Sequence, residues 1–234
     1  MISFAKDKQK QTIISIWQTS FPEDSQEFVD MYFADKYKTE NTLVYMQDNT
    51  LVSCLQMLPY NMLYYNQICC LSYISGASTL PYYQNKGIMG KLLSQSFLEM
   101  KNRGDVFSIL IPQEHWLIAF YQKYGYIHCF EHFSTPAYDC TDCFLDIFAF
   151  LELDNMPVNE VMVRVLDVEK ALRIYASFNT DLQVAIKVND SQIAENNGIF
   201  YIHNGHCCRK QDTYFDIETN VDLLTQQIFS KIIR

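Results

Sequence analysis

The stretch of sequence that decides the fold spans residues 84–90 and reads Gln84-Asn85-Lys86-Gly87-Ile88-Met89-Gly90. It follows the apolar run Gln67–Gly76, which predicts a long buried strand, and it leads into a helix. The helix is indicated by apolar residues that share one helical face, namely Ile88, Leu92, Leu93, Phe97 and Met100, with Gly104 as the expected C-terminal cap. The order strand, glycine-containing turn and helix is therefore predicted here.

This turn has the chemistry of an anion site. The start of a helix leaves several backbone N–H groups without a partner, and the helix dipole adds about half a positive charge there. A pyrophosphate fits such a position, and Gly87 lets the backbone approach it with no Cβ in the way. The Gly-Lys-Ser/Thr of a nucleoside-triphosphate loop and the GxGxxG of a dinucleotide fold are both missing from the turn.

Strands and helices alternate on both sides of the turn, which indicates an α/β layer architecture. Before it, two helical stripes precede a hairpin of Asn41–Met46 and Leu51–Leu58, and Pro59 and Asn61 are expected to end this pattern. After it come a short strand, a helix and another strand-like run, at Val106–Ile111, His115–Lys123 and Tyr126–Phe133.

A second unit is predicted from Val161 onward. It begins with a strand and a helix whose N-cap is Asp167 and which runs through Ala176. Apolar residues then alternate as in a half-buried strand, at Leu182, Val184, Ile186 and Val188. Two hairpin turns (Asn197-Gly198 and Asn204-Gly205) and a final helix (Val221–Ile232) complete it. Residues 136–160 receive no firm assignment.

Composition excludes several classes of protein. The 234 residues are 49% apolar and 19% charged, which excludes a disordered or low-complexity chain. A net charge of −9 argues against nucleic acid as a partner. No apolar run approaches the ~20 residues of a membrane span, and the N-terminus has no apolar signal core. We therefore expect a cytoplasmic protein with neither nucleic-acid nor membrane partners; a homo-oligomer is left open.

The eight cysteines are expected to be reduced thiols and not a disulfide framework. Cys140 and Cys143 form one CxxC pair, and four histidines could in principle complete a zinc site, namely His128, His132, His203 and His206. A structural zinc needs four ligands, and no second pair has zinc-ribbon spacing. No metal is expected.

Two motifs together resemble the GCN5-related N-acetyltransferase (GNAT) superfamily over Tyr73–Tyr126. The first is the family's Gln/Arg-x-x-Gly-x-Gly/Ala, matched by Gln84 and Gly87, with Met89 as a departure. The second is Tyr-x-x-x-Gly-Phe/Tyr, matched within Phe120–Tyr126. The chain is further similar to the enhanced-intracellular-survival (Eis-like) branch, on residues such as Ile74-Ser75-Gly76-Ala77-Ser78-Thr79-Leu80-Pro81 and, near the C-terminus, Met162–Val168.

The resemblance implies an α/β (α+β) fold: a mixed GNAT sheet flanked by helices, followed by a small α+β domain similar to a sterol carrier protein. The implied domains are an acetyltransferase domain at 1–135, a connecting segment at 136–160 and the sterol-carrier-protein-like domain at 161–234. Longer members have a second acetyltransferase-like domain between the two, for which this chain has no room.

The resemblance also implies an enzyme that moves an acetyl group directly from acetyl-CoA to a primary amine of a small molecule or a peptide. The backbone of Ala77, Thr79 and Leu80 would pair with the pantetheine arm, and Gln84 and the amides from Asn85 to Gly90 would hold the pyrophosphate. Tyr121 would protonate the departing thiolate. The general base stays open between Glu114, His115, Glu40 and a chain of water molecules.

The acceptor is less well specified. Five aromatic residues could line its pocket or belong to the core, namely Trp17, Phe21, Tyr64, Tyr65 and Trp116. Glu23 and Asp24 could attract an amine or simply be solvated. Other readings are a CoA-binding protein without catalysis and a lipid-binding module in residues 161–234, whose core we expect to be filled. In Eis-like enzymes the terminal carboxylate is thought to act as the base; here we expect that Arg234 does not.

Overall fold

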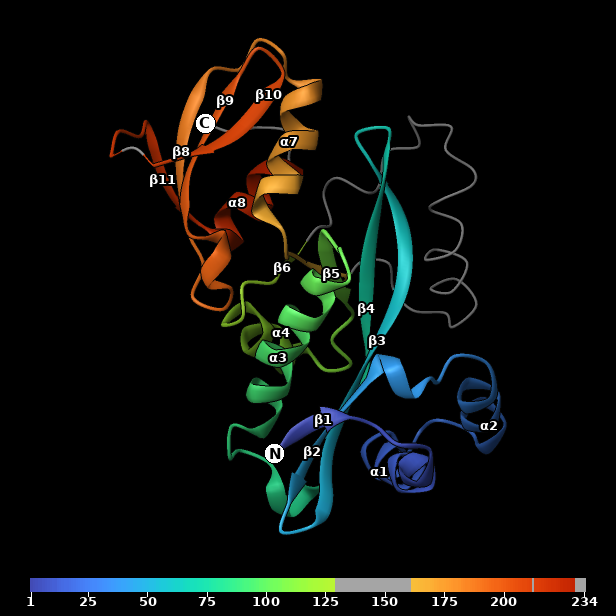
Figure 1. Cartoon of the computed structure of the whole chain (residues 1–234). Helices are drawn as coiled ribbons and strands as arrows, with labels where there is room; N and C mark the ends of the chain where they lie inside the picture. Colours follow the sequence, from blue (N-terminus) through green and yellow to red (C-terminus); the bar gives the residue numbers. More distant parts are fainter. Residues whose placement is uncertain (129–160, 212, 230–234) are drawn as a thin grey trace. The chain divides into compact units, whose positions relative to one another are not determined.

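The computed structural model describes residues 1–128, 161–211 and 213–229. The chain divides into two compact units (Figure 1). The first contains Met1–Pro59 and Tyr73–Glu99, and the second contains Tyr60–Ser72 and Met100–Arg234. The long strands β3 (Thr50–Tyr64) and β4 (Gln67–Thr79) contribute residues to both units.

The first unit contains helices α1 (Lys10–Ser20) and α2 (Gln26–Asp35), strands β1 (Ile2–Phe4) and β2 (Thr42–Gln47), and most of helix α3 (Ile88–Asn102). Three short 3₁₀ helices connect them, at Asp7–Gln9, Thr39–Asn41 and Pro81–Tyr83. The strand order is β1-β2-β3-β4. The predicted two helices, hairpin, long strand and glycine-led helix are confirmed.

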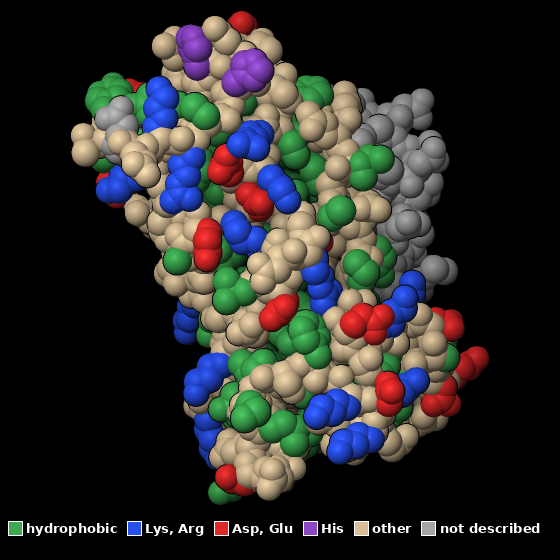
Figure 2. All heavy atoms as spheres, in the orientation of Figure 1, with side chains coloured by type: hydrophobic (Ala, Val, Ile, Leu, Met, Phe, Trp, Pro, Cys, Tyr) green, Lys and Arg blue, Asp and Glu red, His purple; other side chains and the backbone are tan. Residues whose placement is uncertain are grey.

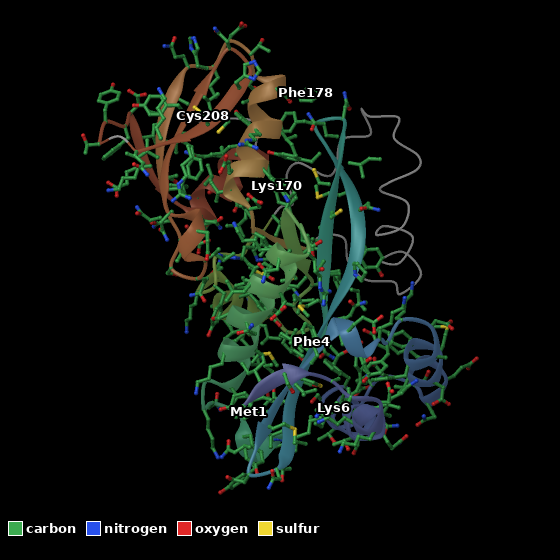
Figure 3. The ribbon with its side chains drawn as sticks, viewed as in Figure 1. Met1, Phe4, Lys6, Lys170, Phe178 and Cys208 are labelled. Carbon is green, nitrogen blue, oxygen red and sulfur yellow. The ribbon has the colours of Figure 1, made fainter. Side chains whose placement is uncertain are left out.

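Local chemistry explains the start of this unit. The Ser25 hydroxyl accepts a hydrogen bond from the N–H of Phe28 and so caps α2. Strand β1, which the sequence analysis did not foresee, pairs antiparallel with β2 and sets Phe4 opposite Leu43. Figure 3 shows Met1 and Phe4 near the two ends of this short strand. The amino group of Met1 donates to the carbonyl of Met46 over 2.7 Å.

In the second unit the larger sheet continues as β4, β5 (Phe107–Leu110), β7 (Met162–Val165) and β6 (Ile127–His128). Strand β7 lies between β5 and β6 and is antiparallel to both. Helix α4 (His115–Gln122) lies between β5 and β6 in the sequence. The strand that we expected to open the C-terminal domain therefore belongs to this sheet, whereas the boundaries proposed at 135 and 161 stay a prediction.

The remaining elements form a smaller sheet with two helices. Its order is β10 (His206–Lys210), β9 (Gly198–His203), β8 (Val184–Asn189) and β11 (Ile217–Asn220), with β11 parallel to β8 and the other pairs antiparallel. Helix α7 (Val168–Phe178) packs on β9 and β10, and α8 (Val221–Phe229) contacts β7 and β11. Figure 3 shows Lys170 and Phe178 toward opposite ends of α7. The predicted N-cap is confirmed, because Asp167 accepts a hydrogen bond from the N–H of Lys170.

Two local predictions are wrong. Strand β3 does not end at Pro59 but runs on through Asn61 to Tyr64; Pro59 is exposed, which is where a strand tolerates a proline. The Asn204-Gly205 hairpin is confirmed, with φ of 48° and 76°, but Asn197-Gly198 is no two-residue turn. There a 3₁₀ helix, Ala194–Asn196, makes the connection from β8 to β9.

Several predictions fall outside the described residues: the strand Tyr126–Phe133 beyond His128, residues 136–160, the end of the last helix and the position of Arg234. Across the residues that are described, no helix is both long and apolar enough to span a membrane.

Candidate functional site

Strand β4 changes conformation at Gly76, which has a φ of 56°. A Cβ on this residue would overlap the indole ring of Trp17, so the glycine is required both for its backbone and for this close approach. The Trp17 indole N–H donates to Asp24 over 2.7 Å, which fixes the ring against the strand. The sequence signal that could have identified Gly76 is a glycine inside an otherwise apolar strand.

The end of β4 is anchored to β3 by buried hydroxyl groups. Ser53 donates to the carbonyl of Ser78 over 2.8 Å and lies 2.8 Å from the Thr79 hydroxyl. The N–H of Leu80 donates to the carbonyl of Val52 over 2.9 Å. Of the three residues predicted to pair with pantetheine, Leu80 therefore already uses its N–H inside the protein, whereas Ala77 is half-buried.

The loop after β4 turns back on itself before α3 begins. The Gln84 side-chain amide donates to the carbonyl of Thr79 over 3.0 Å and so ties the loop to the end of the strand. Asn85 and Gly87 have φ of 60° and 72°. Residues 84–87 are all exposed, and a Cβ on Gly87 would meet no atom within 4 Å. The space over Gly87 is therefore open.

Helix α3 starts directly after this loop and is held in place by its first residues. Ile88 and Gly90 are buried, and Met89, the departure from the motif, is half-buried. The Lys91 N–H donates to the carbonyl of Gly87. The N–H groups at the start of α3 precede the first intrahelical bonds of a 15-residue helix, the arrangement that favours an anion.

Lys86 adds a positive charge to the loop. Its ammonium lies 4.0 Å from the centre of the Tyr82 ring and 5.2 Å from that of Tyr83. Tyr82 is itself highly exposed, at 78% of its surface. A cation–π contact at so exposed a site is weak, about 0.5–1 kcal/mol, so the ammonium can turn to a phosphate at little cost.

Tyr121 lies in the last turn of α4, in the second unit, and is buried. Its ring is edge-on to that of Tyr126, with 5.9 Å between the ring centres. Burial raises the pKa of the Tyr121 phenol to about 12. The phenol is therefore neutral, and able to donate a hydrogen bond, at every physiological pH.

The three candidate bases are exposed side chains. Glu114 is the N-cap residue of α4 but makes no capping hydrogen bond with its side chain, and His115 follows it. Glu40 lies in the first unit, 3.4 Å from the Thr39 hydroxyl. The structure does not single out one of them.

The aromatic candidates do not form one group. Trp17 and Phe21 are in contact in the first unit, with tilted rings whose centres are 5.0 Å apart. Tyr64 belongs to the core of the second unit, against Phe107 and Phe229, which is one of the two roles left open for it. The others in this unit are Tyr65, which packs on Tyr175 and Phe178, and the exposed Trp116.

A hollow of about 630 Å³ lies in the smaller sheet. Its lining includes the polar residues Lys187, Asn189, Arg209 and Lys210 and the apolar residues Val188 and Ile199; Lys and Arg side chains are numerous over this part of the molecule in Figure 2. Lys187 is paired with Glu218 at 2.8 Å, and Arg209 donates to the carbonyls of residues 195 and 197.

The described thiols show no sign of metal binding. Cys54, Cys69, Cys70, Cys207 and Cys208 are free, and within the described ranges no three His, Cys, Asp or Glu side chains gather as metal ligands. Cys140, Cys143 and His132 lie outside these ranges. Burial raises the pKa of the Cys54 thiol to about 11, although a hydrogen bond with Ser78 opposes this.

Comparisons with known proteins agree with this geometry. A family model described as an acetyltransferase (GNAT) domain matches residues 1–129. No curated protein is recognisably similar in sequence. Among solved structures, a GCN5-related N-acetyltransferase from Anabaena variabilis is similar over 98% of this chain and 90% of its own, with a TM-score of 0.73 and 13% identity.

Two further structures match over nearly the whole chain. Eis1 from Mycobacterium abscessus has a TM-score of 0.72 at 12% identity, over 98% of this chain and 89% of its own. A GCN5-related N-acetyltransferase from Kribbella flavida has a TM-score of 0.68 at 9% identity, over 100% of this chain and 93% of its own. At such low identity these matches establish the fold alone, and they confirm the predicted mixed sheet flanked by helices.

Proposed function

Because the chain belongs to the acetyltransferase (GNAT) domain family, we propose that it transfers an acetyl group from acetyl-CoA to a primary amine. The observation that carries the proposal is the open loop of residues 84–87 at the start of α3. It presents backbone N–H groups, a glycine with nothing above it and a lysine in one exposed place. This combination suits the pyrophosphate of CoA.

Each loop residue has a part in holding the donor. Gln84 keeps the loop folded against Thr79, and Gly87 leaves the space that a Cβ would fill. The amides from Asn85 to Gly90 donate to the phosphate oxygens, and Lys86 neutralises their charge. The backbone of Ala77 and Thr79 at the end of β4 pairs with the pantetheine arm as with an added strand, and the N–H of Leu80 keeps its partner Val52.

The reaction is a direct displacement. The amine nitrogen attacks the thioester carbonyl carbon, the C–N bond forms, the C–S bond breaks, and the sulfur leaves with the bonding electrons. The nitrogen loses a proton to Glu114, His115, Glu40 or water. Cys54 is not a ready acetyl carrier, because a buried thiol with a pKa of about 11 is scarcely ionised near neutral pH.

Tyr121 serves the departing sulfur. A phenol with a pKa of about 12 is a weaker acid than a thiol, whose pKa is about 8.5. Burial disfavours the departing thiolate as well, so the pKa of the leaving thiol rises in the same site. The phenol therefore donates a hydrogen bond to the sulfur as the C–S bond breaks and then gives its proton to the thiolate.

The acceptor is proposed only as a class: a small-molecule or peptide amine, attracted to a protein of net charge −9. The sterol-carrier-protein likeness of residues 161–234, membership of the Eis-like branch and a cytoplasmic location are parts of the same proposal. The last is supported by eight cysteines suited to a reducing compartment.

The test is a thiol-release assay with acetyl-CoA and a panel of aminoglycosides, polyamines and lysine peptides, combined with calorimetric binding of CoA. Thiol release that depends on an amine, together with CoA binding, supports the proposal. CoA binding without turnover on any amine would instead identify a CoA-binding protein without catalysis. Failure to bind CoA would refute the site itself.

A further inference from the structure

A fully buried ion pair lies in the second unit. One terminal nitrogen of Arg164, on β7, donates to both carboxylate oxygens of Asp190 at 2.7 Å, and neither side chain has any exposed surface. Arg164 is thus the largest fully buried side chain in the described residues. A buried ion pair by itself contributes little to stability, because the cost of removing two charges from water offsets their attraction.

Asp190 anchors one side of the pair. Its carboxylate also accepts from the N–H groups of Gln192 and Ile193 and from the side chain of Asn196. These bonds shape the connection from β8 to β9 around the carboxylate, which therefore cannot move without the loop. The Asp190 end is the fixed end of the pair.

The other end of Arg164 holds a different segment. Its second terminal nitrogen donates to the carbonyl of Tyr124 over 2.5 Å. The guanidinium lies directly against Gly125, where a Cβ would overlap it, and Gly125 has a φ of 83°. Arg164 therefore links the β8–β9 connection to residues 124–126, the turn that ends α4.

This turn sets the position of Tyr121. The N–H groups of Tyr124 and Tyr126 both donate to the carbonyl of Tyr121, at 2.9 and 3.4 Å. The ring of Tyr126 packs edge-on against that of Tyr121, and its hydroxyl is 2.6 Å from Ser108, the residue paired with Arg164 across β5 and β7. Backbone and ring of Tyr121 are both held by residues that Arg164 touches or adjoins.

We propose that Arg164 and Asp190 are positioning residues, which fix the turn at the end of α4 and thereby the phenol of Tyr121. This role rests on the acetyl transfer proposed above. The role requires an arginine, because a single planar guanidinium donates hydrogen bonds both to the carboxylate of Asp190 and to the carbonyl of Tyr124, which lie on different segments. The segment Met162–Asp190 thus contributes to turnover without touching substrate.

The decisive variant is Arg164→Lys. A lysine keeps a cation beside Asp190 but lacks the planar guanidinium that bonds to Asp190 and Tyr124 at the same time. We expect a folded protein with unchanged affinity for CoA and a kcat lowered about 10- to 100-fold, the effect of a displacement near 1 Å. The matched control is Arg173→Lys, at an exposed pair with Glu169 on α7, which should leave kcat unchanged. A folded Arg164→Lys variant with wild-type kcat would overturn the proposal.

A second variant tests the proposal if the Arg164→Lys protein does not fold. Arg164→Met combined with Asp190→Asn removes both charges and keeps an oxygen for the N–H groups of Gln192 and Ile193. Neutral replacement of a buried pair often preserves stability. We expect the same loss of kcat in a folded protein, and wild-type kcat would again overturn the proposal.

Amide hydrogen exchange on the unmodified protein tests the link without any variant. The N–H groups of Tyr124 and Tyr126 should exchange as slowly as those of Gln192 and Ile193, because the ion pair joins the two segments. If the N–H groups of Tyr124 and Tyr126 exchanged as fast as that of Trp116, at the start of α4, the proposed link through Arg164 would be overturned. If the wild-type protein released no thiol with any amine, the proposed function would fail. The exchange measurement would still show whether Arg164 and Asp190 hold the turn at the end of α4.

Discussion

Two glycines at the ends of helices differ in what surrounds them. Gly87 precedes α3 with a φ of 72°, and Gly125 follows α4 with a φ of 83°. A Cβ would meet nothing at Gly87, whereas at Gly125 it would overlap the buried Arg164. Similar backbone geometry therefore serves two purposes: the first turn is left open for a ligand, and the second is filled by the protein. We expect changes at the open turn to alter binding, and changes at the filled turn to alter stability and turnover.

The largest effect is expected at Tyr121, which the filled turn supports. Tyr121→Phe should lower kcat by ~10²–10⁴ because the hydrogen-bond donor to sulfur is lost. The Kd of CoA should not change, since the donor's phosphates bind at the other turn. Steady-state kinetics and calorimetry on the same preparation measure both. Wild-type kcat in this variant would exclude the role of Tyr121.

The next effect separates the two glycines by stability. Alanine at either position costs about 1–2 kcal/mol for its left-handed backbone. Gly125→Ala should cost about 3–5 kcal/mol more, because it displaces Arg164 and disturbs a buried ion pair. Urea denaturation of both variants gives the two free energies of unfolding. Equal losses in the free energy of unfolding would show that Arg164 moves aside at little cost. The two turns would then not differ in the way proposed.

A smaller effect is expected on CoA binding at the open turn. Asn and Asp tolerate a left-handed backbone and have the same shape, so Gly87→Asn and Gly87→Asp differ in charge alone. Both should weaken binding by occupying the space over the loop. Asp should weaken it at least about tenfold further, since its carboxylate faces a pyrophosphate. Calorimetric Kd values that are the same for Asn, Asp and wild type would place the pyrophosphate elsewhere.

The smallest effect concerns pH. Because the pKa of Tyr121 is raised to about 12, the phenol stays protonated until the pH approaches that value. The kcat of the wild-type protein should therefore show no loss of a phenolic proton between pH 8 and 10, apart from titration of the amine and the base. A fall in kcat centred near pH 10 that is absent from Tyr121→Phe would show an unshifted phenol and a more open α4 terminus.

The two turns also differ in how well they could be predicted from the sequence. The open turn was predicted because its determinants are local: a strand, Gln84, Gly87 and the apolar face of α3 lie within one continuous stretch. The N-cap at Asp167 and the Asn204-Gly205 hairpin were readable for the same reason. Whether CoA binds there, and whether Tyr121 meets its sulfur, are still predictions.

The filled turn at Gly125 could not be predicted, because the residues that surround it are far apart in the sequence. Arg164 appears in the sequence as one charged residue in an apolar strand, and its partners at 124 and 190 lie 40 and 26 positions away. The place of β7 between β5 and β6 was missed for the same reason. The sequence leaves Tyr64 open between a pocket and the core, because its partners Phe107 and Phe229 are also far away in the chain.

The most direct test of the account is a single turnover of acetyl-CoA with an amine acceptor from the panel, followed by mass spectrometry. We predict that acetylated amine and free CoA appear at the same rate and in equal amounts, while the protein never gains an acetyl group. An acetylated protein that precedes the product, or free CoA without acetylated amine, would contradict direct transfer.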